Sequence, residues 1–149
     1  MSEKTFGPFE LQTAYKTEPV PSDFAQRRRI SAAIQLLAER LIRAEADEAT
    51  LAGWAEQLEA MVETVGTPER RDTRDANRKL FTGKATADDI YHMMDYDPVG
   101  GPSNPIAPQV QWLQEDQDGI RGEVSLGLQY QGPPGRVHGG VIAWLLDAG

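Results

Sequence analysis

The residues best suited to chemistry lie near the end of the chain, where His138, Gly139 and Gly140 precede an apolar run that ends at Asp147. The two glycines carry no side chain, so a substrate can come close to their backbone N–H groups. These groups lie where a helix is predicted to start, and the positive end of a helix dipole favours developing negative charge. The pattern therefore predicts a site that stabilises an anion.

Asp147 is the candidate base of this stretch. Residues 141–146 are apolar all round, which predicts a buried helix with Asp147 at the edge of an apolar core. Desolvation there would raise the pKa of the Asp147 carboxyl and suit it to proton transfer. The alternative is a plain tight turn at His138, with Asp147 facing solvent. The spacing, the double glycine and the loop before them together favour the functional interpretation.

The loop before the histidine contains Gly132, Pro133, Pro134 and Gly135, which predict a stiff approach without regular structure. With this loop, the His-Gly-Gly motif and an aspartate nine positions after the histidine, the stretch resembles the hotdog-fold acyl-CoA thioesterases of the PaaI-like thioesterase superfamily. The resemblance covers roughly residues 95–149, about a third of the chain.

The resemblance implies hydrolysis of an acyl-CoA thioester. In that family the amide of the first glycine, here Gly139, polarises the thioester carbonyl with support from the histidine, here His138. The aspartate near the helix end, here Asp147, activates water or attacks directly. The expected substrate-binding positions are Gly140, Gly132 and Gly135.

The sequence departs from the family in two ways. The family often has an asparagine six residues before the histidine, and this chain has Gly132 there. Some members also use a serine on a later strand, which would follow residue 149. We therefore expect a truncated hotdog domain, and we expect the isolated 149-residue chain to be inactive and poorly soluble or partly unfolded, because a two-stranded sheet is marginal by itself.

Helix geometry places the two halves of the expected site on different chains. Nine residues of helix, from His138 to Asp147, span about 13.5 Å and about half a turn of net rotation, so we expect His138 with Gly139 to point to the side opposite Asp147. Two such helices packed antiparallel about a two-fold axis bring Asp147 of one near Gly139 of the other. We therefore expect a homodimer or a dimer of dimers.

The composition argues against several classes of protein and site. The net charge is −8, from 15 basic and 23 acidic residues, which argues against non-specific binding to nucleic acid or anionic membranes. No cysteine is present, which rules out disulfides, thiolate nucleophiles and Cys-based zinc sites. We expect no cofactor and no metal, since His92 has no spaced ligand partner. The chain shows neither a membrane span nor a signal-peptide pattern, so we expect a cytoplasmic protein.

Helical spacing of apolar residues predicts helices near residues 23–45 and 48–65. We interpret residues 1–21 as a loose arm, Arg27–Arg29 as a solvated first turn and residues 67–84 as a solvated linker. The alternative for the basic residues of this linker is a patch that faces the 3′-phosphate of CoA. A short helical turn is expected after Thr86.

Alternating polarity predicts strands near residues 108–115 and 120–131, joined by the turn that ends at Gly119. The helix after His138 is expected to cover their apolar face. The fold class is therefore α+β, with a helical N-terminal extension and linker (1–84) followed by the N-terminal part of a hotdog domain (85–149).

The expected function is hydrolysis of an acyl-CoA-type thioester to free acid and CoA. The alternative is a non-catalytic acyl-binding or protein-interaction fragment, and a hotdog hydratase or dehydratase ranks third because its motif usually lacks the double glycine. The sequence leaves open the acyl group, the thiol carrier and whether Asp147 acts as base or nucleophile.

Overall fold

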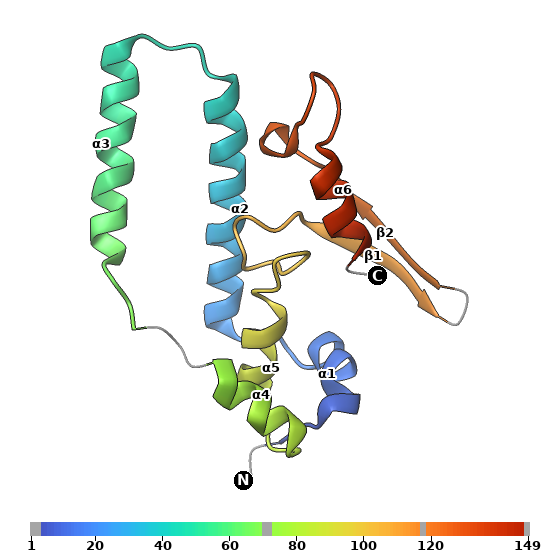
Figure 1. Ribbon diagram of the computed structural model, residues 1–149. Coiled ribbons are helices and arrows are strands. Elements are labelled where there is room, and N and C mark those ends of the chain that lie inside the picture. Colours follow the sequence, from blue (N-terminus) through green and yellow to red (C-terminus); the bar gives the residue numbers. More distant parts are fainter. Residues whose placement is uncertain (1–3, 70–72, 117–118, 148–149) are drawn as a thin grey trace.

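The computed structural model describes residues 4–69, 73–116 and 119–147 and shows an α+β chain (Figure 1). Two long helices run antiparallel, and the short helices are grouped near the lower end of the longer one in the view of Figure 1. The sheet and the last helix lie on the side of the longer helix that faces away from the other long helix (Figure 1). The elements are, in chain order, η1 (Pro8–Glu10), α1 (Leu11–Thr17), α2 (Ser22–Arg43), α3 (Glu48–Val65), α4 (Thr73–Phe81), α5 (Ala87–Met94), β1 (Val110–Asp116), β2 (Gly119–Val124), η2 (Leu128–Tyr130) and α6 (Gly139–Leu146).

The predicted helices near 23–45 and 48–65 are confirmed as α2 and α3. Asp47 caps α3, because its side chain accepts a hydrogen bond from the Thr50 N–H at 2.8 Å. Gly66, with a φ of 66°, ends the helix. These signals are local, so the sequence is sufficient to place them.

The apolar core lies in the part of the chain that was expected to be irregular. Phe6 pairs with Ala85 through two backbone hydrogen bonds of 2.8 and 3.3 Å. α1 packs on α5, and α5 packs on α4. The loose arm predicted for residues 1–21 is therefore wrong where the structure describes it, and so is the solvated linker over 73–81. The buried residues of this core are Phe6, Ala14, Leu80, Ala85 and Ile90.

A buried carboxylate, Asp95, ties α1 and α2 to the end of α5. Arg28 donates two hydrogen bonds to it, from Nε at 2.9 Å and from Nη2 at 2.6 Å. The Tyr15 hydroxyl donates a third at 2.7 Å, and the Ser103 hydroxyl donates a fourth. Burial raises the pKa of the Asp95 carboxyl, but its donors outweigh that effect and the net pKa lies below the ordinary value. The expectation that Arg28 belongs to a solvated turn is wrong.

The turn after Asp95 requires glycine at position 101. A Cβ there would lie 2.5 Å from the Asp95 carbonyl oxygen and 2.5 Å from the Asp97 nitrogen. We expect Gly101→Ala to lower the free energy of unfolding by about 1–3 kcal/mol, because these backbone atoms cannot move aside cheaply. Gly100→Ala is the matched control, since its Cβ would meet nothing nearer than 3.9 Å. Urea denaturation measures both, and equal effects would contradict the prediction.

β1 and β2 form an antiparallel hairpin, with Val110 opposite Val124 and a register shift between Trp112 and Gln114. The strand predicted for 120–131 is too long, because β2 ends at Val124 and η2 occupies 128–130. η2 packs on α2 instead of extending the sheet. Tertiary contact with α2 has therefore replaced the last part of the expected strand.

No helix in the described part of the chain is long and apolar enough to cross a membrane.

Candidate active site

The loop that leads to His138 closes on itself through backbone hydrogen bonds. The Gly132 N–H donates to the Arg136 carbonyl at 2.9 Å, and the Arg136 N–H donates to the Pro133 carbonyl at 2.9 Å. Gly135 has a φ of 74°. A glycine with positive φ directly after a proline is the pattern of a type II turn. The Gly/Pro stretch thus forms a defined turn before the histidine.

A backbone hydrogen bond to η2 holds His138 in place. Its N–H donates to the Tyr130 carbonyl at 2.9 Å. Tyr130 is buried, and its hydroxyl donates to the Ile106 carbonyl at 3.2 Å. A Cβ on Gly132 would lie 2.9 Å from the His138 Cα, so the close approach of these two residues requires glycine. Because η2 packs on α2, the long helix positions the start of α6.

His138 is the N-cap of α6 and shapes the donors at its first turn. The His138 Nδ1 accepts a hydrogen bond from the Gly140 N–H at 3.0 Å. The Val141 N–H donates to the His138 carbonyl at 2.9 Å. The Gly139 N–H has no partner among the described residues, and the space where its Cβ would stand is open to at least 4 Å. The sequence predicted that the N–H groups of Gly139 and Gly140 would both be available to a substrate. In the structure the Gly140 N–H is used by the cap, and the Gly139 N–H remains available.

This cap also sets the tautomer of the His138 ring. A neutral imidazole has one N–H donor and one acceptor nitrogen, and here Nδ1 is the acceptor. The ring proton therefore lies on Nε2, on an exposed side chain. The helix start thus presents two donors, the Gly139 N–H and the His138 Nε2–H.

Asp147 lies at the other end of α6, where its N–H donates to the Ala143 carbonyl at 3.1 Å. It is exposed, and α6 contains no buried residue. Ile142 and Leu146 are 48% and 76% exposed. The prediction of a buried helix with a desolvated Asp147 is therefore wrong for the single chain, because Val141, Trp144 and Leu145 are only partly covered and the other residues of α6 are exposed. The structure brings together His138, Gly139, Gly140 and Gly132, but not Asp147.

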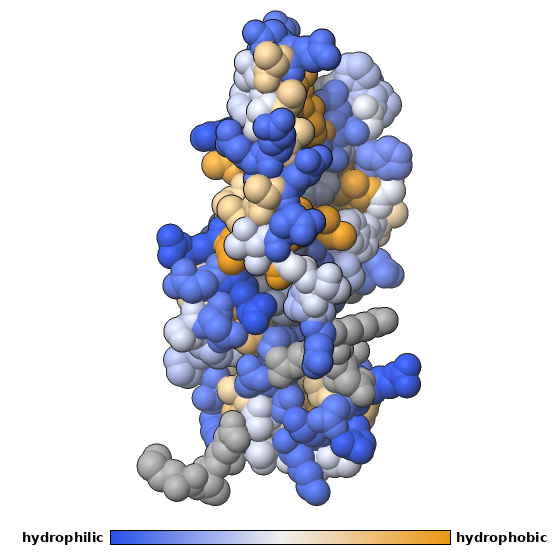
Figure 2. All heavy atoms as spheres, turned by 90° about the vertical axis from the view of Figure 1, so that its left-hand side faces the viewer, coloured by the Kyte–Doolittle hydropathy of each residue, from blue (hydrophilic) through white to orange (hydrophobic). Residues whose placement is uncertain are grey.

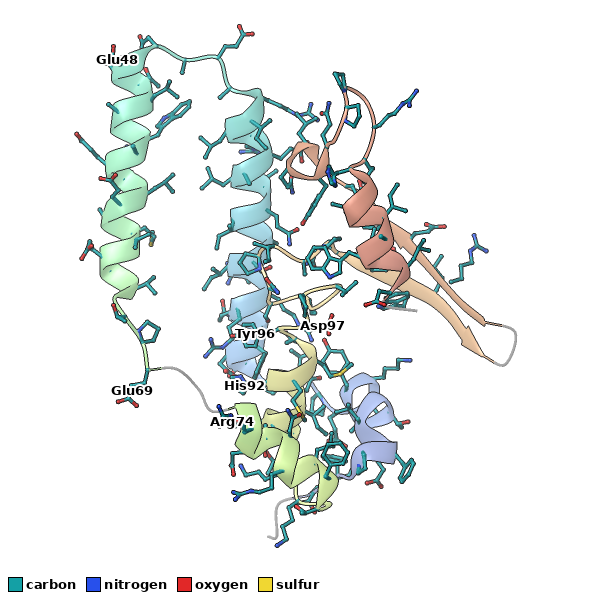
Figure 3. The ribbon with its side chains drawn as sticks, in the orientation of Figure 1. Glu48, Glu69, Arg74, His92, Tyr96 and Asp97 are labelled. Carbon is teal, nitrogen blue, oxygen red and sulfur yellow. The ribbon has the colours of Figure 1, made fainter. Side chains whose placement is uncertain are left out.

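Of the basic residues considered for CoA phosphate binding, Arg70 and Arg71 lie outside the described residues, and those of α4 lie away from α6 (Figure 1). α4, which starts near Arg74, lies at the end of the molecule away from α6 (Figures 1 and 3). In α4, Lys79 pairs with the buried Asp89 at 3.2 Å. His92 stacks on Tyr96, with ring centroids 5.8 Å apart. The described residues contain no group of three or more His, Asp or Glu side chains placed to hold a metal ion.

The cluster around Asp95 was missed from the sequence. Arg28 and Asp95 are separated by 67 residues, and Tyr15 and Asp95 by 80. No local pattern connects them. The burial of Asp95, with 0% of its side chain exposed, identifies it as structural rather than as part of a site open to substrate.

No protein-family model matches the chain, and no curated protein matches it. Among solved structures, it is similar to the crystal structure of a thioesterase superfamily protein, with a TM-score of 0.59 and 30% sequence identity. The match covers 89% of this chain and 64% of the other one, so the chain spans less than two thirds of its structural neighbour. The similarity supports a thioesterase-like fold of the α+β class.

Proposed function

We propose that the protein hydrolyses an acyl-CoA-type thioester to free acid and CoA. The similarity to a thioesterase superfamily protein supports the reaction class. The observation that carries the proposal is the Gly139 N–H at the positive end of α6, which has no partner among the described residues, together with the exposed His138 side chain whose Nδ1 is fixed by the Gly140 N–H. Donors fixed in this way stabilise an oxygen that becomes negative in the transition state.

In the proposed reaction the thioester carbonyl oxygen binds the Gly139 N–H and the His138 Nε2–H. Asp147 takes a proton from a water molecule, whose oxygen attacks the carbonyl carbon, or its carboxylate attacks directly. The C–S bond then breaks and the CoA thiolate leaves and takes up a proton. In the direct route, water releases the acid from the Asp147 anhydride. Gly140, Gly132 and Gly135 are the proposed substrate-binding positions, because they belong to the helix start and to the turn that leads to it.

The proposal requires a second subunit. Gly139 and Asp147 stand at opposite ends of α6, about 12 Å apart along its axis at 1.5 Å per residue. We propose a homodimer or a dimer of dimers in which two α6 helices pack antiparallel. Such packing would cover Ile142 and Leu146, and it would remove Asp147 of one chain from water beside Gly139 of the other. In this arrangement residues 85–149 form the first part of a hotdog domain that follows the helical extension 1–84.

The exposure of Asp147 in the single chain favours one second candidate, a non-catalytic acyl-binding or interaction module. An assay of the full-length protein with short, long and aromatic acyl-CoAs separates the two candidates. Released CoA is followed with a thiol reagent, and the 149 residues contain no cysteine that would add background. Hydrolysis predicts turnover of at least one acyl-CoA. Tight binding measured by calorimetry, with no thiol released across the panel, would support the binding module instead.

A further inference from the structure

The α2–α3 hairpin, which comprises α2, α3 and the turn between them, exposes two apolar stripes. α3 contains no buried residue, and Figure 2 shows apolar side chains between charged ones on this side of the molecule. Exposed apolar stripes of this extent mark interaction surfaces. The stripe of α2 contains Ile30, Ile34, Leu37 and Leu41, which are 59%, 45%, 37% and 37% exposed, and that of α3 contains Leu51, Leu58, Met61, Val62 and Val65, at 47%, 39%, 63%, 66% and 67%.

The two helices carry opposite charge. Every charged residue of α3 is a glutamate, whereas α2 contains five arginines against one aspartate and one glutamate. Complementary charges beside an apolar stripe select the partner and the orientation of packed helices. The charge therefore indicates that α3 pairs with α2, from the same chain or from a second copy.

The charges beside the stripes also match in spacing. At about 100° per residue, Glu48 and Glu59 lie about 80–100° to one side of the α3 stripe, viewed from the N-terminus. Arg29 and Arg40 lie about 90–110° to the opposite side of the α2 stripe. Each pair is eleven residues apart, about three turns. Within the described residues, neither Glu48, Glu59 nor Arg40 has an ion-pair partner, and Arg29 bonds only Gln26, at 2.7 Å.

The side of its stripe on which each charge lies shows whether α3 pairs with α2 of its own chain or with α2 of a second copy. Each stripe has two edges, one clockwise and one anticlockwise of it when its own helix is viewed from the N-terminus. When two helices pack antiparallel, the two clockwise edges meet each other, and when they pack parallel, the clockwise edge of one meets the anticlockwise edge of the other. α2 and α3 of one chain run antiparallel (Figure 1), so closing them would leave the arginines and glutamates on opposite sides. The charges meet when α3 comes from another copy and runs parallel to α2.

A hollow beside the α2 stripe fits the same arrangement. A cavity of about 150 Å³ opens between α2 and the 96–105 segment, with Ile30 and Ile34 in its lining. The buried Ser31 Oγ in this lining has no partner among the described residues. With a parallel α3 in place, this edge faces the edge of α3 that carries Trp54 and Met61. With Glu48 level with Arg29, Trp54 lies level with residue 35 of α2, so the Trp54 side chain of the second copy can fill the hollow.

We propose that two copies of the chain pair their α2–α3 hairpins into a four-helix bundle. The two-fold axis is perpendicular to the helices, and α3 of each copy lies parallel on α2 of the other, with Glu48 and Glu59 beside Arg29 and Arg40. In this register residues 48–62 of α3 lie along residues 29–43 of α2, so each contact is about 22 Å long. This interface is separate from the α6 pairing and does not depend on the thioesterase proposal.

The first test is the mass of the assembly in solution, measured by light scattering after size exclusion. Leu58→Asp places a charge in the middle of the α3 stripe, at a position already exposed in the single chain. We expect it to halve the mass, from dimer to monomer, or from tetramer to dimer if α6 also pairs. A monomeric wild-type protein, or an unchanged mass for Leu58→Asp, would overturn the proposal.

The second test uses the charges and keeps every apolar residue. Glu48→Arg with Glu59→Arg should weaken this association at least tenfold, and adding Arg29→Glu with Arg40→Glu should restore it. Glu56→Arg with Glu63→Arg is the matched control, with the same change of charge on the same helix but farther from the stripe. Sedimentation equilibrium measures all three. An equal loss in the control, or no recovery in the fourfold variant, would contradict the parallel pairing.

Discussion

Gly139→Pro in the full-length protein is expected to lower kcat for acyl-CoA hydrolysis about 100- to 1000-fold, the range for loss of one oxyanion donor. Proline is favoured at the first position of a helix, and His138 has the extended backbone (φ −63°, ψ 132°) that suits the residue before proline. The variant therefore removes the N–H and keeps α6. Gly139→Ala is the matched control, because it retains the N–H and its Cβ would meet nothing within 4 Å. Equal losses in the two variants would contradict the role of the N–H.

Asp147→Asn should lower the same rate about 100- to 10,000-fold, the range for loss of a general base. The shared site makes a sharper prediction for a mixture of the two inactive variants. After subunit exchange about half of the dimers are mixed, and one of the two sites in each has a normal Gly139 and a normal Asp147. About a quarter of the wild-type activity should return. If exchange is demonstrated by mass spectrometry and no activity returns, the shared site is wrong and the chemistry must lie within one chain.

Asp95→Asn is expected to lower the free energy of unfolding by about 3–5 kcal/mol, because it leaves Arg28 without its buried partner. Urea denaturation followed by circular dichroism measures the loss. Asp23→Asn is the control, since Asp23 also faces an arginine, Arg27 at 3.4 Å, but on the exposed surface. Exposed pairs of this kind contribute about 0–1 kcal/mol. A small effect at Asp95 would show that the cluster is not what holds α1, α2 and α5 together.

The same carboxylate predicts an acid dependence. The pKa of Asp95 in the folded protein lies below its ordinary value, so the folded state binds its proton less readily than the unfolded state. The stabilisation is complete above the ordinary carboxyl pKa of about 4, and it is lost as the pH falls through the folded pKa. The free energy of unfolding of the wild-type protein should therefore fall on acidification below about pH 4, and Asp95→Asn should reduce that slope.

The elements that the sequence predicted are those with local signals. α2 and α3 follow from apolar residues at helical spacing, and the hairpin follows from alternation around the turn at Gly119. The start of α6 follows from His138 and the two glycines, since capping and φ preferences act within a few residues. The same local chemistry indicated the Gly139 N–H as an available donor.

α1 and α4 were missed because each is short and depends on tertiary contact. Among the described side chains, the buried residue of α1 is Ala14 and those of α4 are Ala76 and Leu80. Isolated helices of this length are marginal in water, so their stability comes from packing rather than from propensity. The prediction that the second strand continues to residue 131 was wrong for a related reason, because η2 packs on α2 instead.

The tertiary structure alone decided which side chains are buried and which charged residues pair with each other. An arginine in a charged run, Arg28, became the partner of a carboxylate 67 residues away, because folding brought the ends of α2 and α5 together. The apolar side chains of α3 and α6 indicate in the sequence that these helices need a cover, and the described chain fully buries no residue of either helix. A hydrophobic pattern specifies how much surface must leave water, but only the arrangement of whole elements determines which surface covers it.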